Sequence, residues 1–272
     1  MKRLNLRAIA GVACVACLAA PAAASAKTTV TMSGSTSIQP LAAQLASSYL
    51  KVPGIRSKVS FRLAAGGSDI GINDVARGRV TIGNSSRDPV PGDPDGLVFN
   101  KIARDAICLV THRSNAIANI SQETIQAIFS GRVRSWSQVP GASASGPIDL
   151  VVRTAASGTQ DAFQNIFMGQ ELRVSPSASV RSSNGLQAQA IRSNPNAIGY
   201  ASFNFTEGLH SIPYRGVRCS LPNAKSGQYL GSRNFWMVTR GPARGAAKAF
   251  IRWIRRSRTA NQIISTNWVP LR

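Results

Sequence analysis

The sequence has few acidic residues and almost no histidine. Its 272 residues include 32 Lys and Arg but only 11 Asp and Glu, with two His. His112 and His210 lie far apart in the chain, and no group of carboxylates has the spacing of metal ligands. Protein metal sites require grouped His, Cys, Asp or Glu side chains. This scarcity argues against a metal centre, and we expect neither a metal nor a cofactor.

Long apolar runs are missing after the first 26 residues. Before that point, Lys2, Arg3 and Arg7 precede an apolar run over residues 8–20, and residues 24–26 read Ala-Ser-Ala. This pattern predicts a secretory signal peptide over residues 1–26. The apolar run is too short for a stable membrane anchor. We therefore expect an exported protein with one large domain or two modest ones.

Cysteine is scarce as well. Cys108 and Cys219 are the two that follow the predicted signal peptide, and their spacing fits no metal site. In an oxidising compartment they could form a disulfide, but two separate buried thiols agree equally well with the sequence.

The shortage of acidic residues gives a net charge of +21, of which three positive charges lie in the signal peptide. Strongly basic proteins often bind nucleic acid. Export and the lack of alternating basic and aromatic residues argue against that partner here. We interpret the charge as a field that attracts small anions. A surface that adheres to anionic polymers is the alternative.

A hydroxyl-rich turn over residues 153–159 is the most informative local feature. It follows an apolar strand at residues 148–152 and precedes apolar residues at helical spacing, including Phe163. The unpaired N–H groups at a helix start favour anions, and Arg153 adds a two-pronged guanidinium. The turn therefore predicts a site for a tetrahedral oxyanion. The alternative is an ordinary helix cap by Ser or Thr.

Three further turns repeat this pattern at residues 33–37, 64–68 and 84–88. The first two lie between predicted strands and helices, and the third follows a short strand at residues 80–83. In an open α/β sheet, ligands bind beyond the carboxyl ends of the strands. Four hydroxyl-rich turns at such positions predict one shared site. Further strands are predicted at 106–111, 197–200 and 235–239, and helices at 122–129, 186–192 and 243–265, the last interrupted near 258–259.

Taken in order, these turns resemble the substrate-binding proteins of ABC-type phosphate importers. The resemblance covers essentially the whole chain after residue 26. It rests on residues 34–40, 66–72, 82–87, 128–136, 153–159 and 194–200.

The resemblance implies an α/β periplasmic-binding-protein fold, in which two lobes joined by crossing hinge strands close on a ligand in the cleft. Lobe I would comprise residues 27–106 and 239–272, and lobe II residues 107–238. It also implies a periplasmic monomer without enzymatic activity. That protein would capture inorganic phosphate and deliver it to an ABC-type permease in the inner membrane.

Site residues follow from the same resemblance. Those of one lobe would be Thr36, Ser37, Ser68 and Ser86, and those of the opposite lobe would be Arg153, Ser157, Gly158 and Thr159. Arg153 would supply charge, and the others hydroxyl or backbone N–H groups.

The chain departs from the family at Ser86, where well-known members have an Asp that accepts the proton of phosphate. Ser86 can accept or donate a hydrogen bond, and Asp69 or Asp88 could serve as the acceptor instead. Arg87 could be a second ligand or a partner of Asp88. Sulfate, arsenate and molybdate therefore remain alternative ligands. A phosphatase with Ser157 as nucleophile is a weaker alternative, because no base accompanies that residue in the sequence.

Overall fold

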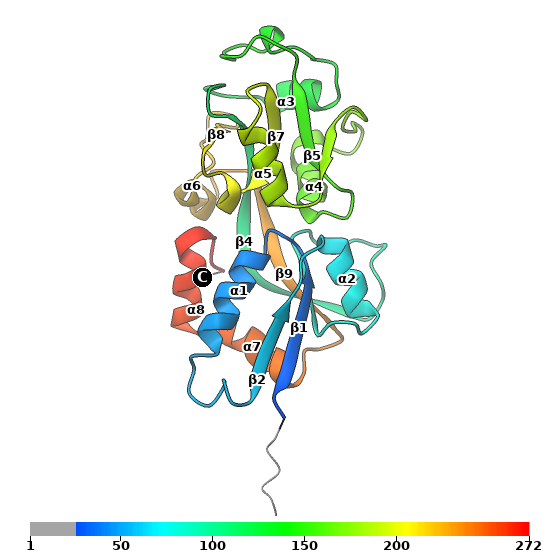
Figure 1. Cartoon of the computed structure of the whole chain (residues 1–272), viewed down its shortest axis with the longest axis vertical. Helices are drawn as coiled ribbons and strands as arrows, with labels where there is room; N and C mark the ends of the chain where they lie inside the picture. Colours follow the sequence, from blue (N-terminus) through cyan, green and yellow to red (C-terminus); the bar gives the residue numbers. More distant parts are fainter. Residues whose placement is uncertain (1–25, 272) are drawn as a thin grey trace, which may run out of the picture.

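The computed structural model describes residues 26–271, so the predicted signal peptide lies almost wholly outside the described residues. Two α/β lobes are stacked along the long axis of the molecule (Figure 1). The strands are β1 (Thr28–Gly34), β2 (Val59–Leu63), β3 (Ile82–Ser85), β4 (Leu97–His112), β5 (Asp149–Arg153), β6 (Ser179–Arg181), β7 (Ala197–Ser202), β8 (Leu209–Ile212) and β9 (Ser232–Arg240). The helices are α1 (Gln39–Tyr49), α2 (Ser68–Ala76), α3 (Gln122–Phe129), α4 (Gly158–Phe163), α5 (Asn184–Arg192), α6 (Leu221–Ser226), α7 (Gly245–Arg256) and α8 (Arg258–Asn267).

The first lobe is built on the strand order β2-β1-β3-β9-β4. β1 runs parallel to β2 and β3, whereas β9 is antiparallel to both β3 and β4. The larger core lies between one face of this sheet and helices α1, α7 and α8, and includes Leu41 and Phe250. On the other face α2 packs Ile72 and Val75 against β9. The parallel strands direct their carboxyl ends toward the second lobe.

The second lobe contains the far half of β4, with β7 and β8 antiparallel to it. β5 is parallel to β7 and β6. Its core includes Phe129, Phe163 and Tyr200, and the rings of Phe163 and Tyr200 are stacked. A disulfide joins Cys108 to Cys219 in this lobe, which decides between the two alternatives that the sequence left open.

β4 passes from one lobe to the other. Residues 97–106 pair with β9, and residues 107–112 pair with β7 and β8. The chain returns near Gly231, whose carbonyl oxygen accepts a hydrogen bond from the Ile107 N–H. All of β9 pairs within the first sheet, so its pairing supports a second lobe boundary near Gly231. We propose this boundary in place of the one expected between residues 238 and 239.

The α/β architecture and the order of strands and helices predicted for residues 28–267 are confirmed. The helix expected from the apolar spacing around Phe163 begins at Gly158 and continues as a π-helical turn (Gln164–Met168). The C-terminal helix breaks at Ser257. The short elements β6, β8 and α6 were not predicted, because three to six residues carry too little periodicity. No helix in residues 26–271 is long and apolar enough to cross a membrane.

Candidate functional site

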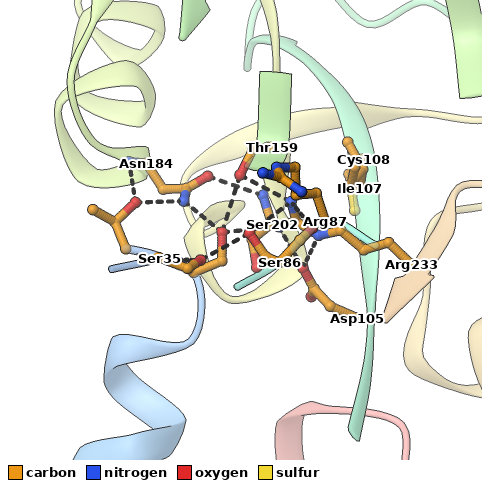
Figure 2. Close-up of polar contacts among 12 residues, drawn as sticks. Ser35, Ser86, Arg87, Asp105, Ile107, Cys108, Thr159, Asn184, Ser202 and Arg233 are labelled. Atoms are coloured by element: carbon orange, nitrogen blue, oxygen red, sulfur yellow. Dashed lines mark hydrogen bonds and ion pairs between the residues drawn. The ribbon is translucent and has the colours of Figure 1, made fainter. Parts of the chain in front are cut away.

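The four hydroxyl-rich turns meet between the lobes. Thr36 and Ser37 precede α1, Ser68 begins α2, Ser86 follows β3, and the turn at residues 157–159 opens α4. All eight residues predicted for the site are buried. Hydroxyl groups from opposite lobes are in direct contact, since Ser37 Oγ lies 3.0 Å from Thr159 Oγ1. Figure 2 shows Thr159 together with Ser35 and Ser86 of the other lobe. The structure thus brings the predicted residues into one place.

The cleft between the two lobes is closed in this structure. A Cβ on Gly158 would lie 2.3 Å from Ser68 Oγ and 2.8 Å from the Arg87 backbone nitrogen. The Asp69 N–H donates a hydrogen bond of 3.2 Å to the carbonyl oxygen of Ala156 in the other lobe. Only a residue without a side chain allows this approach, which explains glycine at position 158.

Arg153, at the end of β5, is a buried cation with no carboxylate partner among the described residues. Its guanidinium donates to the carbonyl oxygens of Arg181 (3.1 Å) and Ser182 (2.9 Å), and across the cleft to Thr36 Oγ1 (3.2 Å). Nη1 is buried and has no hydrogen-bond partner. Burial lowers the pKa of Arg153 to about 10. A buried charge of this kind is costly unless it is paired, so the arrangement favours an anion beside Nη1.

Asn184 also belongs to this cluster, although sequence reasoning did not select it. It lies in the first turn of α5 and is fully buried. Its Nδ2 donates to Thr36 Oγ1 (3.0 Å) and Ser37 Oγ (2.8 Å), and its Oδ1 accepts a hydrogen bond from the Ser202 N–H. The sequence carried a signal for it, because Asn184 and Gly185 stand directly before the helix predicted at residues 186–192.

Arg233 of β9 and Asp105 of β4 form a buried ion pair, which the sequence analysis also missed. Arg233 Nη2 lies 2.8 Å from Asp105 Oδ2. Burial raises the pKa of Asp105 despite the nearby guanidinium, and it lowers the pKa of Arg233 despite the carboxylate. Arg233 also donates to Ser37 Oγ (2.8 Å) and Thr159 Oγ1 (3.0 Å). Arg233 therefore contacts site hydroxyls from both lobes, and Asp105 holds its guanidinium.

Ser157 is the N-cap of α4, and its Oγ accepts hydrogen bonds from the N–H groups of Thr159 and Gln160. The ordinary capping role considered for this turn is therefore present. Capping uses the oxygen lone pairs and leaves the Ser157 O–H available as a donor.

Ser86 lies among other hydroxyls. Its Oγ accepts a hydrogen bond from Ser35 Oγ at 2.8 Å and lies 3.3 Å from Ser68 Oγ, and its N–H donates to Ser68 Oγ. Ser86 therefore lies in the hydroxyl cluster as expected, and its contact with a ligand stays a prediction.

The two carboxylates considered as substitutes for the family's Asp are engaged elsewhere. Asp69 pairs with Arg87 at 2.7 Å, and Asp88 accepts hydrogen bonds from Asn234 and Trp236. Arg87 pairs with Asp69 and Asp93, and contacts only the backbone carbonyl of Asp88. The suggested side-chain pair between Arg87 and Asp88 is therefore wrong, because two better-placed carboxylates bind its guanidinium.

The comparisons with known proteins agree with this arrangement. A family model described as the PBP superfamily domain matches residues 19–258. The phosphate-binding protein PstS of Bacillus subtilis is 26% identical over 90% of this chain and 82% of its own length. A crystal structure of a putative phosphate ABC transporter substrate-binding protein of Clostridium perfringens, with bound phosphate, has a TM-score of 0.83 and 28% identity, and the match covers 90% of this chain and all of that one. Alkaline phosphatase L of Pseudomonas aeruginosa is 28% identical over 58% of this chain and 42% of its own length. The chain belongs to the PBP superfamily and has the two-lobed fold of the phosphate-binding proteins within it.

Proposed function

We propose that this protein captures inorganic phosphate and delivers it to an ABC-type permease. The observation that carries the proposal is the buried Arg153 guanidinium, whose free Nη1 has no carboxylate partner among residues 26–271. It lies among hydroxyls from both lobes. A relative named as a phosphate-binding protein matches most of the chain in sequence, and a solved putative phosphate transporter protein with bound phosphate shares its fold.

The ligand contacts are part of the proposal. Arg153 Nη1 would supply the charge from lobe II, together with the hydroxyls of Ser157 and Thr159 and the backbone N–H of Gly158. The lobe I donors would be Thr36, Ser37, Ser68 and Ser86. Hydrogen bonds to a charged oxyanion are about twice as strong as those between neutral groups, so a small anion can hold the two lobes together.

A binding role is favoured over hydrolysis by the surroundings of Ser157. The cleft offers that hydroxyl no histidine, because His112 Nδ1 contacts Ser114 and His210 Nε2 contacts the carbonyl oxygen of Ile117. A nucleophilic serine needs an adjacent base. Release of phosphate from a chromogenic ester by the pure protein would support the phosphatase alternative instead.

Calorimetric titration of the protein with phosphate, sulfate, arsenate and molybdate tests the proposed function. We expect phosphate to bind at micromolar concentration or below. Arg153→Ala should remove that binding, whereas Arg132→Ala, which changes an exposed arginine of the same lobe, should not. Absence of heat with phosphate would contradict the proposal, and preference for another anion would reassign the ligand.

We further propose that the protein is a periplasmic monomer, released by cleavage of the leader. Mass spectrometry of the exported protein would locate its first residue, and sedimentation would give its oligomeric state. Transport of phosphate by vesicles that contain the cognate permease should require addition of this protein.

A further inference from the structure

A row of cations lies along α7 on the surface of the first lobe. Figure 1 shows this helix at the end of the lobe that faces away from the second lobe. From the N-cap to the last turn, its basic residues fall within about a third of the helix circumference and span about 18 Å, at 3.6 residues and 5.4 Å per turn. All of them are exposed, as is the arginine that begins α8. Together they form the α7 row: Arg244, Lys248, Arg252, Arg255, Arg256 and Arg258.

No carboxylate within the described chain neutralises this row. The last acidic residue of the sequence is Glu207, so β9, α7 and α8 contain none. None of the ion pairs formed within residues 26–271 includes a member of the row. Only Arg255 uses its side chain for a hydrogen bond in this part of the chain, to the carbonyl oxygen of Lys101. An ordinary solvated helix face mixes charges of both signs, and this one does not.

Two hollows lie beside the α7 row, one of about 370 Å³ and the other of about 400 Å³. Arg255 and Arg256 line both of them. Each also has an exposed apolar side chain, Leu271 in the first (42% exposed) and Val98 in the second (36%). No carboxylate of the described residues lines either hollow. The face combines cations with accessible apolar groups, so its complement is an anion that carries apolar groups of its own.

We infer that the α7 row and its two hollows rest on an anionic lipid bilayer. A bilayer presents phosphate-bearing head groups above apolar chains, which matches both parts of the face. Its lipids can also diffuse to meet cations that are not held in place. Clusters of about four to eight Lys and Arg residues on an amphipathic helix are typical of binding to anionic lipids. A soluble acidic polymer offers no apolar groups, and an acidic protein would require cations fixed at matching positions.

Docking through α7 leaves the ligand cleft free. The helix packs its apolar side into the core of the first lobe through Phe250, Ile251 and Ile254. The protein would therefore lie on the bilayer without inserting this helix. The cleft is at the opposite end of the first lobe, between the two lobes (Figure 1). The bilayer would keep the protein close to a membrane permease while the lobes remain able to close. This inference goes beyond the proposed function and does not depend on which anion the cleft binds.

The test is sedimentation of the intact protein with lipid vesicles at about 0.1 M salt, where surface charges act over about 10 Å. We expect binding to vesicles of phosphatidylglycerol and phosphatidylcholine in equal amounts, and none to vesicles of phosphatidylcholine alone. Binding should weaken as the salt concentration rises, because salt screens exposed charges. Equal binding to both kinds of vesicle, or to neither, would overturn the inference. Tighter binding to soluble polyglutamate at the same concentration of charge would also overturn it and assign the face to an acidic polymer or protein.

A triple variant tests whether the α7 row is the part that binds. Lys248→Gln, Arg252→Gln and Arg256→Gln together should weaken vesicle binding roughly 100-fold, about fivefold for each charge near the surface. The matched control removes the same net charge from exposed positions of the second lobe and should weaken binding less than about fivefold, because charges far from the bilayer are screened. An equal loss in both would show that net charge alone drives binding, and would overturn the inference. The control variant carries Arg113→Gln, Arg132→Gln and Arg218→Gln.

A single charge reversal keeps the test decisive if the triple variant does not fold. Arg252→Glu changes the charge by two and should weaken vesicle binding about 25-fold. Circular dichroism would show that each variant is folded, and calorimetry should show that phosphate binding is unchanged. Unchanged vesicle binding by folded Arg252→Glu would overturn the inference. Failure of phosphate to bind the original protein would instead contradict the proposed function, and the vesicle result would stand by itself.

Discussion

Gly158 and Ser68 belong to opposite lobes, yet a Cβ on Gly158 would lie only 2.3 Å from Ser68 Oγ. The closed cleft therefore depends on the absence of one methyl group. Gly158→Ala should hold the lobes apart and weaken phosphate binding by about 10- to 100-fold, in line with the cost of overpacking. Small-angle scattering with saturating phosphate should then show a larger radius of gyration than for the unchanged protein. Gly92→Ala, where a Cβ meets nothing within 4 Å, is the control, and equal affinity of all three proteins would contradict the prediction.

Arg153 should not be replaceable by lysine. Its guanidinium donates to two carbonyl oxygens and to Thr36 Oγ1 while Nη1 remains free. An ammonium has the charge but only three donors and no planar fork. We expect Arg153→Lys to weaken phosphate binding by about 10- to 100-fold, the equivalent of one or two charged hydrogen bonds. Calorimetry would measure this, with Arg132→Lys as control. An affinity within about twofold of the original would show that charge alone suffices.

The turns of the site could be predicted from the sequence because the pattern that marks each turn lies within a short stretch of the chain. A strand, a short run of Gly, Ser and Thr, and a helix are visible within about 20 residues, as at Ser157 to Thr159. The groups that orient those hydroxyls could not be found in this way. Arg233 contacts Ser37 across 196 positions of sequence, and nothing near either residue marks the pairing.

The Ser86 question shows the same limit. The resemblance to the phosphate importers' binding proteins implies an Asp at the position of Ser86, but the local sequence does not say whether the hydroxyl that stands there donates or accepts. That property depends on Ser35 and Arg233, which come from different turns and strands. Which donors surround a hydroxyl depends on how the cleft packs, so only the structure could show whether Ser86 donates or accepts.

The disulfide between Cys108 and Cys219 should stabilise the second lobe substantially. It spans 111 positions of sequence, and closing a loop of that size in the unfolded chain is worth about 4–5 kcal/mol in the chain-entropy treatment. Cys108→Ala with Cys219→Ala should lower the free energy of unfolding by roughly 2–5 kcal/mol in denaturant titrations. Reductant should destabilise the original protein to a similar extent and leave the double variant unaffected. Equal stability of the oxidised protein and the variant would contradict the expectation.

The ion pair between Arg87 and Asp93 should make stability depend on pH in the acid range. The carboxylate accepts two hydrogen bonds from the guanidinium, at 2.5 and 3.0 Å. Burial raises the pKa of Asp93, but these bonds outweigh burial and the pKa is lowered below its ordinary value. The contribution to stability is then complete above the unfolded-state pKa of about 4 and is lost as pH falls through the lower folded-state pKa.

Asp93→Asn should accordingly lower the free energy of unfolding by about 1.5–3 kcal/mol near neutral pH, the range for a hydrogen bond to a charged group. The deficit should shrink in acid, because the original protein also loses the charge there. Denaturant titrations of both proteins over the acid range would measure the difference. Asp95→Asn, an exposed change two residues away, should show no deficit at any pH. A deficit for Asp93→Asn that stays constant or grows in acid would mean that the pair is not held as its geometry indicates.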